Sequence, residues 1–519
     1  MRFTRLRWLA GINASAVALA LTLIAPVRVE ATKHPRYGGT LRIELHVPAL
    51  SLDPREWKPG SVAAADSERL AGLVYDRLLM LDDYGRFQPG LAMEWSHDPA
   101  AKVWQFKLRN GVKFSDGTAL TAKDVVAALQ PLLPAGLTIS AGENSVAFHA
   151  QRAVPDLLEQ LASERYFVYR AQAGSALVGT GPFVVAETVP AAPSEGNPAV
   201  LKPARLKLRA NEECWAGRPF LDAIDVMLGD PALRQVLNLQ VGRAELIDIP
   251  PDLVRKARQE NLRVWSSPPD TLLALRFDEV QPATGDARLR EALDLSLDRE
   301  TMANVLLQRQ AMPAPGLLPQ WLSGYAFLFG GGMNLERAKE LKAELPANTA
   351  GGTEPLRLRV DAVGDLMKLL GERVAVNARQ ANLAVQLVPH TAGVGSAGGA
   401  PGSAAGLHLF AWHYDSLSPR AELRQIAQHL HAEPGVEVAS ESSDPEKLFA
   451  DERQLLDTRR VLPLLLLPEY VGIAPNVRNW SVAPNGEWRL ADVWLETEQV
   501  AGSNGDGSGE PGGARGVHR

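Results

Sequence analysis

Strands and helices alternate in one region of the sequence, and this order constrains the fold more than any other feature. "PLRLRVDA" (355–362) predicts a strand, and apolar residues at helical spacing predict a helix over 366–380. Two further apolar runs, "LAVQLV" (383–388) and "LHLFAW" (407–412), predict strands. A strand–helix–strand order is typical of α/β architecture. We therefore expect at least one α/β lobe in this chain.

A second dense set of local signals lies in "WQFKLRNGVKFSDGTALTAKDVVAAL" (104–129). Its first residues alternate between apolar and polar, which predicts a half-buried strand. The Asn-Gly pair at 110–111 is favoured in type I′ hairpin turns, so residues 112–114 are expected to return as the partner strand. Thr121 and Asp124 have the spacing of a capping box at a helix start. Nothing in this stretch has to be catalytic, and we interpret it as scaffold.

Length and composition set the scale of the fold. The chain has 519 residues, about three times a typical domain, so two or three lobes are expected. Hydrophobic residues make up 46% and charged residues 22%, which is enough for a sizeable core. The formal net charge of -6 gives no reason to expect nucleic acid as a partner.

The beginning of the chain has the pattern of an export signal. Three arginines occur in the first seven residues, an apolar run covers 8–24, and Val29 and Ala31 supply small residues before a cleavage site. The pattern predicts a cleaved signal peptide of residues 1–31 and a protein located in the periplasm. The alternative is an uncleaved membrane anchor, but the run contains polar residues and is short for a membrane span.

Cys214 is the only cysteine. An exported chain with one cysteine has no internal disulfide, so its stability has to come from core burial. A lone cysteine is more often a small buried hydrophobic residue than a nucleophile. No cysteine lies near the expected cleavage site, so a lipid anchor of the bacterial lipoprotein type is not expected.

Motifs for catalysis are missing or lack their structural context. "GVGSAG" (393–398) satisfies Gly-x-Gly-x-x-Gly, but the glycines and the proline that follow forbid the helix that dinucleotide binding requires. The sequence contains neither the His-Glu-x-x-His motif of zinc enzymes nor the Gly-x-Ser-x-Gly motif of hydrolases. We therefore expect no enzymatic activity, no cofactor and no metal site.

A series of motifs follows one order along most of residues 38–495. The series comprises "GGTLRI", "SLDP", "FQPGLAMEWSHDPAAKVWQFKLRNGVKFSDGTALTAKDVVAAL" (87–129), "GTGPFVV" (179–185), "ANEECWAGRPFLDAIDV" (210–226), "DARLREALDLSLDRETMANVLLQRQAMPAPGLLP" (286–319), "WHYDSLSP" (412–419) and "VLPLLLLPEY" (461–470). It resembles the large extracellular solute-binding proteins of ABC importers, the family of oligopeptide-, dipeptide- and nickel-binding proteins.

The resemblance implies an α/β, two-lobed periplasmic-binding-protein fold of the class II type, with an extra small α/β domain inserted in the first lobe. The two lobes would close on a solute by a hinge motion. The expected bounds are 32–56, 171–270 and 461–500 for lobe I, 57–170 for the extra domain, 271–460 for lobe II and 501–519 for a disordered tail.

The resemblance also implies a function. We expect a monomeric periplasmic component of an ABC importer that captures a peptide or peptide-like solute and delivers it to a permease in the inner membrane. Within the family, the alternatives are a binder of nickel or another metal chelate, of haem or of a sugar. From other classes, the alternatives are an exported hydrolase and a regulatory or sensory protein.

Most of the candidate ligand-binding residues lie in one stretch near residue 413. This stretch contains aromatic residues, and aromatic walls suit a protein that binds varied solutes. Peptide-binding members carry an Asp in a Trp-x-x-Asp-Tyr-type stretch, and this Asp pairs with the free amino group of the ligand. Counted from Tyr414, that position is His413, and Asp415 lies beyond it. A neutral His cannot replace a carboxylate as an ammonium partner, so the usual amine capture is in doubt. The candidate residues are Trp57, Lys58, Trp412, His413, Tyr414 and Asp415.

Overall fold

The structure is a computed structural model of the whole chain. It describes residues 34–163, 165–172, 177–190, 192–194, 197–202, 204–277, 285–346, 355–361, 365–388, 406–430 and 444–496. The expected signal peptide (1–31), the expected tail (501–519) and the glycine-rich stretch 393–398 lie outside the described residues.

One sheet of eleven strands runs through the molecule, in the order β10-β13-β14-β1-β15-β21-β16-β20-β18-β19, with β17 paired to β21. Strand β1 pairs in parallel with β14 and β15, and β18 pairs in parallel with β19 and β20, while the other pairs are antiparallel. Its strands are β1 (Thr40–Leu45), β10 (Phe183–Val189), β13 (Ala204–Ala210), β14 (Ala223–Leu228), β15 (Leu246–Asp248), β16 (Arg263–Phe277), β17 (Met312–Pro313), β18 (Leu356–Val360), β19 (Val385–Val388), β20 (Leu407–His413) and β21 (Val461–Ile473).

Smaller sheets and the helices complete the fold. A four-stranded sheet has the order β4-β5-β7-β6, and the other small sheets have two strands each. The remaining strands are β2 (Leu79–Leu81), β3 (Phe87–Pro89), β4 (Ala92–His97), β5 (Val103–Leu108), β6 (Leu137–Ala141), β7 (Ser145–Ala150), β8 (Arg170–Ala171), β9 (Leu177–Val178), β11 (Ala192–Ser194), β12 (Asn197–Lys202), β22 (Val477–Arg478) and β23 (Trp494–Leu495). The α-helices are α2 (Val62–Ala71), α3 (Ala122–Leu129), α4 (Leu157–Leu161), α5 (Ala232–Gln240), α6 (Pro251–Gln259), α7 (Ala287–Ser296), α8 (Arg299–Thr301), α9 (Gln320–Ser323), α10 (Leu335–Ala343), α11 (Asp365–Gln380), α12 (Pro419–His429) and α13 (Pro445–Asp457).

Buried side chains of the described residues form four hydrophobic clusters. The first core is built on β1, β14 and β15 with α2, α5 and α6, and the second on β18 and β20 with α7, α10 and α11. The third core lies between the four-stranded sheet and helices α3 and α4. The fourth core packs α12, α13 and the loop from Ala314 to Tyr325 against β16, β20 and β21. Several separate cores in one chain fit the expectation of more than one lobe.

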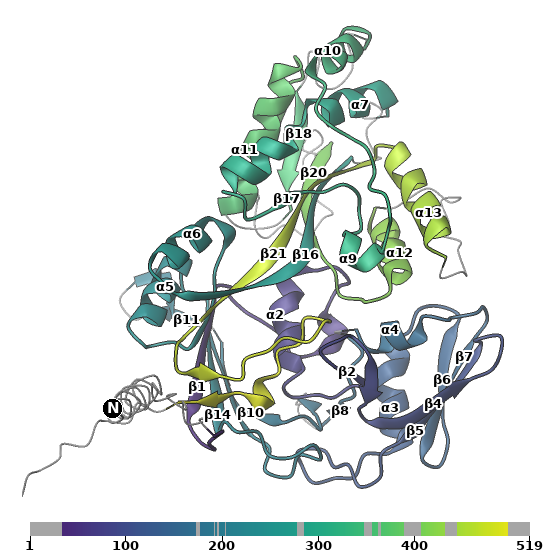
Figure 1. The fold of residues 1–519 in the computed structure, drawn as a ribbon, viewed down its shortest axis with the longest axis vertical. Helices are drawn as coiled ribbons and strands as arrows, with labels where there is room; N and C mark the ends of the chain where they lie inside the picture. The colour runs from purple at the N-terminus through teal and green to yellow at the C-terminus, as the bar shows by residue number, and fades with distance from the viewer. Residues whose placement is uncertain are drawn as a thin grey trace, which may run out of the picture. The chain divides into compact units, whose positions relative to one another are not determined.

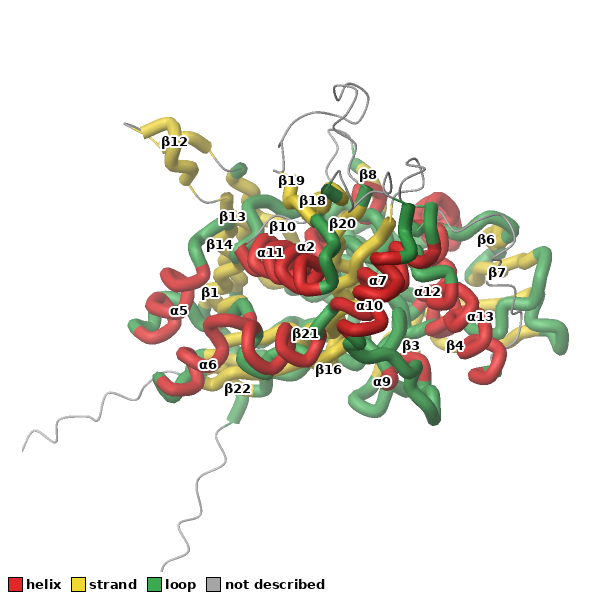
Figure 2. The backbone as a smooth tube through the Cα atoms, turned by 90° about the horizontal axis from the view of Figure 1, so that it is seen from above, coloured by secondary structure: helices red, strands yellow, loops and turns green. Residues whose placement is uncertain are grey.

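Two long strands, β16 and β21, connect the first core to the second and fourth cores. Their pairing in the sheet places them side by side, and Figure 1 and Figure 2 show them crossing the middle of the molecule. Residues 264–265 and 470–473 pack at the first core, whereas apolar residues within 272–277 and 461–467 belong to the second and fourth cores. The register shifts once between Leu273 and Ala274 and twice within 266–271, between these two zones. Irregular pairing weakens a ladder locally, so this is where we expect the two strands to bend most easily.

Several local predictions are confirmed, and one is wrong. Strands and a helix form at 355–412 in the expected order, and Thr121 and Asp124 make both hydrogen bonds of a capping box. The predicted hairpin at 110–111 does not form, because β5 pairs with β4 and β7 instead of with residues 112–114. The preceding strand β4 and the more distant β7 thus occupy both edges of β5, and the turn at 110–111 joins no pair of strands.

The domain bounds stay predictions. The third core contains side chains from Leu78 to Val168, inside the range expected for the extra domain. Trp57 and α2, which that range also includes, pack in the first core. No helix among the described residues is long and apolar enough to cross a membrane.

Candidate functional site

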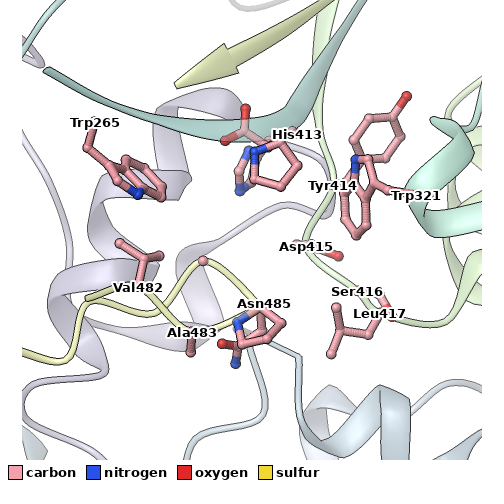
Figure 3. Close-up of a pocket in the computed structure, with 14 residues that line it drawn as sticks. Trp265, Trp321, His413, Tyr414, Asp415, Ser416, Leu417, Val482, Ala483 and Asn485 are labelled. Atoms are coloured by element: carbon pink, nitrogen blue, oxygen red, sulfur yellow. The ribbon is translucent and has the colours of Figure 1, made fainter. Parts of the chain in front are cut away.

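A cavity of about 310 Å³ lies beside the irregular part of β16. Four segments that are far apart in the sequence line it (Figure 3). Strand β16 contributes Trp265 and Asp270, α9 contributes Trp321, and the segments 413–417 and 482–486 form the remaining walls. The cavity therefore depends on the folding of the whole chain and cannot come from one motif.

Two indole rings form apolar walls of the cavity. Figure 3 shows Trp265 and Trp321 on opposite sides in that view, with His413 between them. The indole N–H of Trp321 donates to the Pro269 carbonyl at 2.7 Å, which holds α9 against β16. Sequence reasoning missed both tryptophans, because no local pattern distinguishes them from core residues. Flat apolar walls of this kind suit a solute with an apolar body.

The most unusual polar group in the cavity wall is the carboxylate of Asp415, whose residue is 4% exposed. The Gly60 N–H donates to its Oδ2 over a long 3.4 Å, and Oδ1 has no hydrogen-bond partner among the described residues. Burial raises the pKa of Asp415, although the charge of Arg165 and a side-chain hydrogen bond with Glu422 oppose the shift. A buried oxygen without a hydrogen-bond partner is costly, so a donor brought to Oδ1 would lower the free energy of this arrangement.

Glu422 on α12 fixes the backbone of the same wall. Its Oε1 accepts the N–H groups of Asp415 and Ser416 at 2.9 and 2.8 Å, and its Oε2 accepts the indole N–H of Trp412 at 3.0 Å. The side chain is fully buried, and burial raises its pKa well above the ordinary value. The segment that carries Asp415 is therefore anchored to α12 by a side chain that does not line the cavity.

Glu452 on α13 anchors the loop that leads to α9. It accepts hydrogen bonds from the N–H groups of Leu317 and Leu318 and from the hydroxyl of Tyr325. Burial raises the pKa of Glu452 to about 7, against the lowering effect of these three donors. The loop is thus held on the fourth core, and with it the Trp321 wall.

Gly60 makes the closest backbone approach near the site. Its φ is +69°, and a Cβ atom there would lie 2.3 Å from ring atoms of Trp412. Its carbonyl accepts the His413 N–H at 2.9 Å. Only a glycine fits between the first core and this ring without displacing it.

Three of the six predicted binding residues line the cavity: His413, Tyr414 and Asp415. The Tyr414 hydroxyl donates to the Leu317 carbonyl at 2.6 Å, so this side chain also ties the wall to the α9 loop. Contact of any of the three with a solute stays a prediction.

The other three predicted residues do not line this cavity. The Trp412 ring lies beneath Gly60, and Trp57 is buried in the first core, where its N–H donates to the Ser51 carbonyl at 2.8 Å. Lys58 is exposed on the surface. A role for these residues in binding stays a prediction as well.

No metal centre is visible in the described part of the chain. Among those residues, no group of three or more His, Cys, Asp or Glu side chains is arranged to hold a metal ion. Cys214 is buried, and burial raises its pKa to about 11, so its thiol is protonated at neutral pH.

Solved structures with the same architecture define the fold class. NikA from Staphylococcus aureus, in complex with Ni(L-His)2, superposes with a TM-score of 0.69 at 19% identity, covering 88% of this chain and 100% of the other. DppA from Helicobacter pylori, in complex with the peptide STSA, superposes with a TM-score of 0.73 at 17% identity, covering 89% and 99%. The expected two-lobed periplasmic-binding-protein fold is confirmed.

Sequence relatives then identify the family. The nickel-binding protein NikA of Staphylococcus aureus is 26% identical over 293 residues, which is 53% of this chain and 55% of that protein. The probable D,D-dipeptide-binding periplasmic protein DdpA of Escherichia coli is 25% identical over 307 residues, or 54% and 55%. The chain spans about half the length of the curated relatives it matches. Residues 86–429 match the model of the bacterial extracellular solute-binding proteins, family 5, and the chain belongs to this family.

Proposed function

We propose that the protein binds a small solute in the cavity and delivers it unchanged to the permease of an ABC importer, working as a monomer in the periplasm. The observation that carries this proposal is the position of the cavity. Its walls come from the first core side, through 482–486, and from the fourth core side, through 413–417 and Trp321. A bend in β16 and β21 would separate these walls and admit a solute.

A thermal-shift screen tests the proposal. Free dipeptides, their amides and the nickel–histidine complex should be compared, because a bound solute stabilises the folded protein by RT ln(1 + [L]/Kd). We expect about 2.7 kcal/mol at a hundredfold excess over Kd. Chemical turnover of a compound that causes no shift would contradict the proposal and favour the exported hydrolase.

For the solute itself, we propose a peptide or peptide-like amine that pairs with Asp415. Counted from Trp412, the Asp of the Trp-x-x-Asp pattern falls on Asp415, whereas counting from Tyr414 reaches His413. The buried Oδ1 of Asp415, which has no hydrogen-bond partner in the part of the chain that the structure describes, supports the first alignment. The names of two relatives also favour a peptide as the solute, since one is a probable D,D-dipeptide-binding protein and the other a probable di/tripeptide-binding protein.

A nickel chelate is the second candidate, and His413 is the observation that favours it. This side chain lines the cavity in the same region as Asp270, and a relative is named as a nickel-binding protein. An imidazole can ligate or contact a bound chelate. A peptide amine would bind better with a carboxylate at position 413, whereas a nickel chelate would bind better with the imidazole of His413. A substitution at this position therefore distinguishes the two candidates.

Replacing His413 by aspartate should distinguish the two solutes. A second carboxylate in the wall should strengthen the binding of a free dipeptide by roughly tenfold and should weaken the binding of nickel–histidine. Isothermal titration calorimetry measures both, with His413→Asn as the neutral control. Unchanged affinity for both compounds would remove His413 from the site.

A further inference from the structure

Asp156, immediately before α4, makes two buried contacts with a distant part of the chain. Its Oδ1 accepts a hydrogen bond and ion pair from the Arg420 guanidinium, and its Oδ2 accepts from the Ser418 hydroxyl. Gln160 also donates to Oδ2, at 3.1 Å. The side chains of Asp156 and Arg420 are 11% and 7% exposed. The contact is therefore almost completely shielded from water.

The two sides of this contact belong to different cores. Leu157 and Leu161 of α4 pack in the third core, whereas Leu423 and Ile426 of α12 pack in the fourth. Figure 1 shows α4 next to α12. Breaking the Asp156 contact would leave the apolar packing inside each core intact. The strength of this contact therefore affects how readily the third core separates from the fourth.

The same short helix also reaches the opposite wall of the cavity. After α4, the Ala162 carbonyl accepts a hydrogen bond from the Asn485 amide at 2.9 Å, and Asn485 lines the cavity. Ser418 directly follows the 413–417 wall and caps α12, accepting from the Ala421 N–H at 3.1 Å. One end of α4 is thus tied to the 413–417 wall and the other end to the 482–486 wall.

We propose that Asp156, with Ser418 and Arg420, forms a latch that holds the two walls of the cavity together and limits how often it opens. Asp156 is a positioning residue, since it does not line the cavity. The inference rests on the proposed function in one respect, namely that the cavity opens to exchange its solute.

The charges of Asp156 and Arg420 attract each other in a buried place, so separating the two side chains costs free energy. Burial pushes the pKa of Asp156 upward, but Arg420 and the hydrogen bonds from Ser418 and Gln160 prevail, and the net pKa is lowered. Asp156 is therefore ionised at neutral pH and faces a cation. Replacing Asp156 removes one of the groups that compensate the buried Arg420 charge, so the arrangement in which both side chains are buried becomes less favourable.

Distance measurements between two spin labels test the latch without any solute. Labels at Lys102→Cys, next to the third core, and Lys447→Cys, on α13 of the fourth core, report on its opening in a Cys214→Ser background; both lysines are exposed. In Asp156→Asn, double electron–electron resonance should show a second, longer distance between the labels in more than about one molecule in ten. The protein that keeps Asp156 should show only the shorter distance. Glu245→Gln is the control, because it breaks an ion pair with Arg42, whose side chain is 43% exposed, beside the strands of the first core and away from the latch, and it should leave the distances unchanged.

A milder variant keeps the test decisive if Asp156→Asn does not fold. Ser418→Ala removes one of the contacts to Asp156 and should give a smaller population at the longer distance. Asn334→Ala, which removes the cap of α10 in the second core, controls for the lost helix cap. A distance distribution that stays single and unchanged in the folded latch variants overturns the proposal.

The outcome separates this inference from the proposed function. If wild-type protein binds none of the compounds in the thermal-shift screen, the proposed function fails whatever the labels show. If wild-type protein binds a dipeptide while Asp156→Asn and Ser418→Ala keep the wild-type distances, only the latch is refuted.

Discussion

Replacing Asp415 by asparagine should weaken the binding of a free dipeptide by roughly a hundredfold, because a buried charge pair loses about 2–5 kcal/mol when one partner is removed. The carboxylate oxygen Oδ1, which has no hydrogen-bond partner among the described residues, is the one that we expect to accept from a protonated amine. An asparagine amide carries no charge to attract the ammonium group. Isothermal titration calorimetry on the purified protein measures the loss directly.

Two controls isolate the charge pair. An N-acetylated dipeptide has no ammonium group, so its affinity should be the same for wild type and Asp415→Asn. Asp270→Asn should have a smaller effect than Asp415→Asn, because Ser267 and Thr271 already donate to the Asp270 carboxylate at 2.9 and 3.1 Å. Equal affinity of wild type and Asp415→Asn for the free dipeptide would contradict amine capture by this residue.

Gly60→Ala should destabilise the protein strongly, by about 2–5 kcal/mol. Two costs add: an L-residue in the left-handed region loses roughly 1–2 kcal/mol, and overpacking against Trp412 typically costs another 1–3 kcal/mol. The Cβ atom would lie 2.3 Å from the ring, so the ring or the backbone has to move. Differential scanning calorimetry should show a clear fall in the unfolding temperature.

Gly111→Ala is the matched control for this loss. Gly111 also has a positive φ, of +77°, but a Cβ atom there would meet nothing within 4 Å. Only the backbone cost of about 1–2 kcal/mol remains. If the two variants unfold at the same temperature, the close approach of Gly60 to Trp412 contributes nothing to stability.

The alternation of strands and helices was predictable because its signals are local. Residues 355–412 show apolar periodicities that change from strand to helix and back, and the structure forms β18, α11, β19 and β20 there. The Asn-Gly pair at 110–111 is also a local signal, yet it failed as a hairpin. Strand β5 pairs with the preceding strand β4 on one edge and with the distant strand β7 on the other, and no window of residues around 110–111 contains β7.

The candidate site was predictable only where a motif crosses it. The segment 413–415 was identified from the family pattern, and the structure places it in the cavity wall. Trp265, Trp321 and the segment 482–486 come to the same cavity through the long pairing of β16 with β21 and through contacts with the third core. Nothing in the neighbourhood of these residues in the sequence indicates that they meet.

The scattered origin of the cavity walls has a consequence for biosynthesis. The segment 482–486 forms one wall of the cavity. Strand β21, which pairs with the cavity-lining strand β16, ends only at Ile473. A nascent chain that stops short of these residues has no enclosed space in which to hold a small molecule. A solute that binds in this cavity, as proposed above, can therefore enter it only after the chain is complete and has folded.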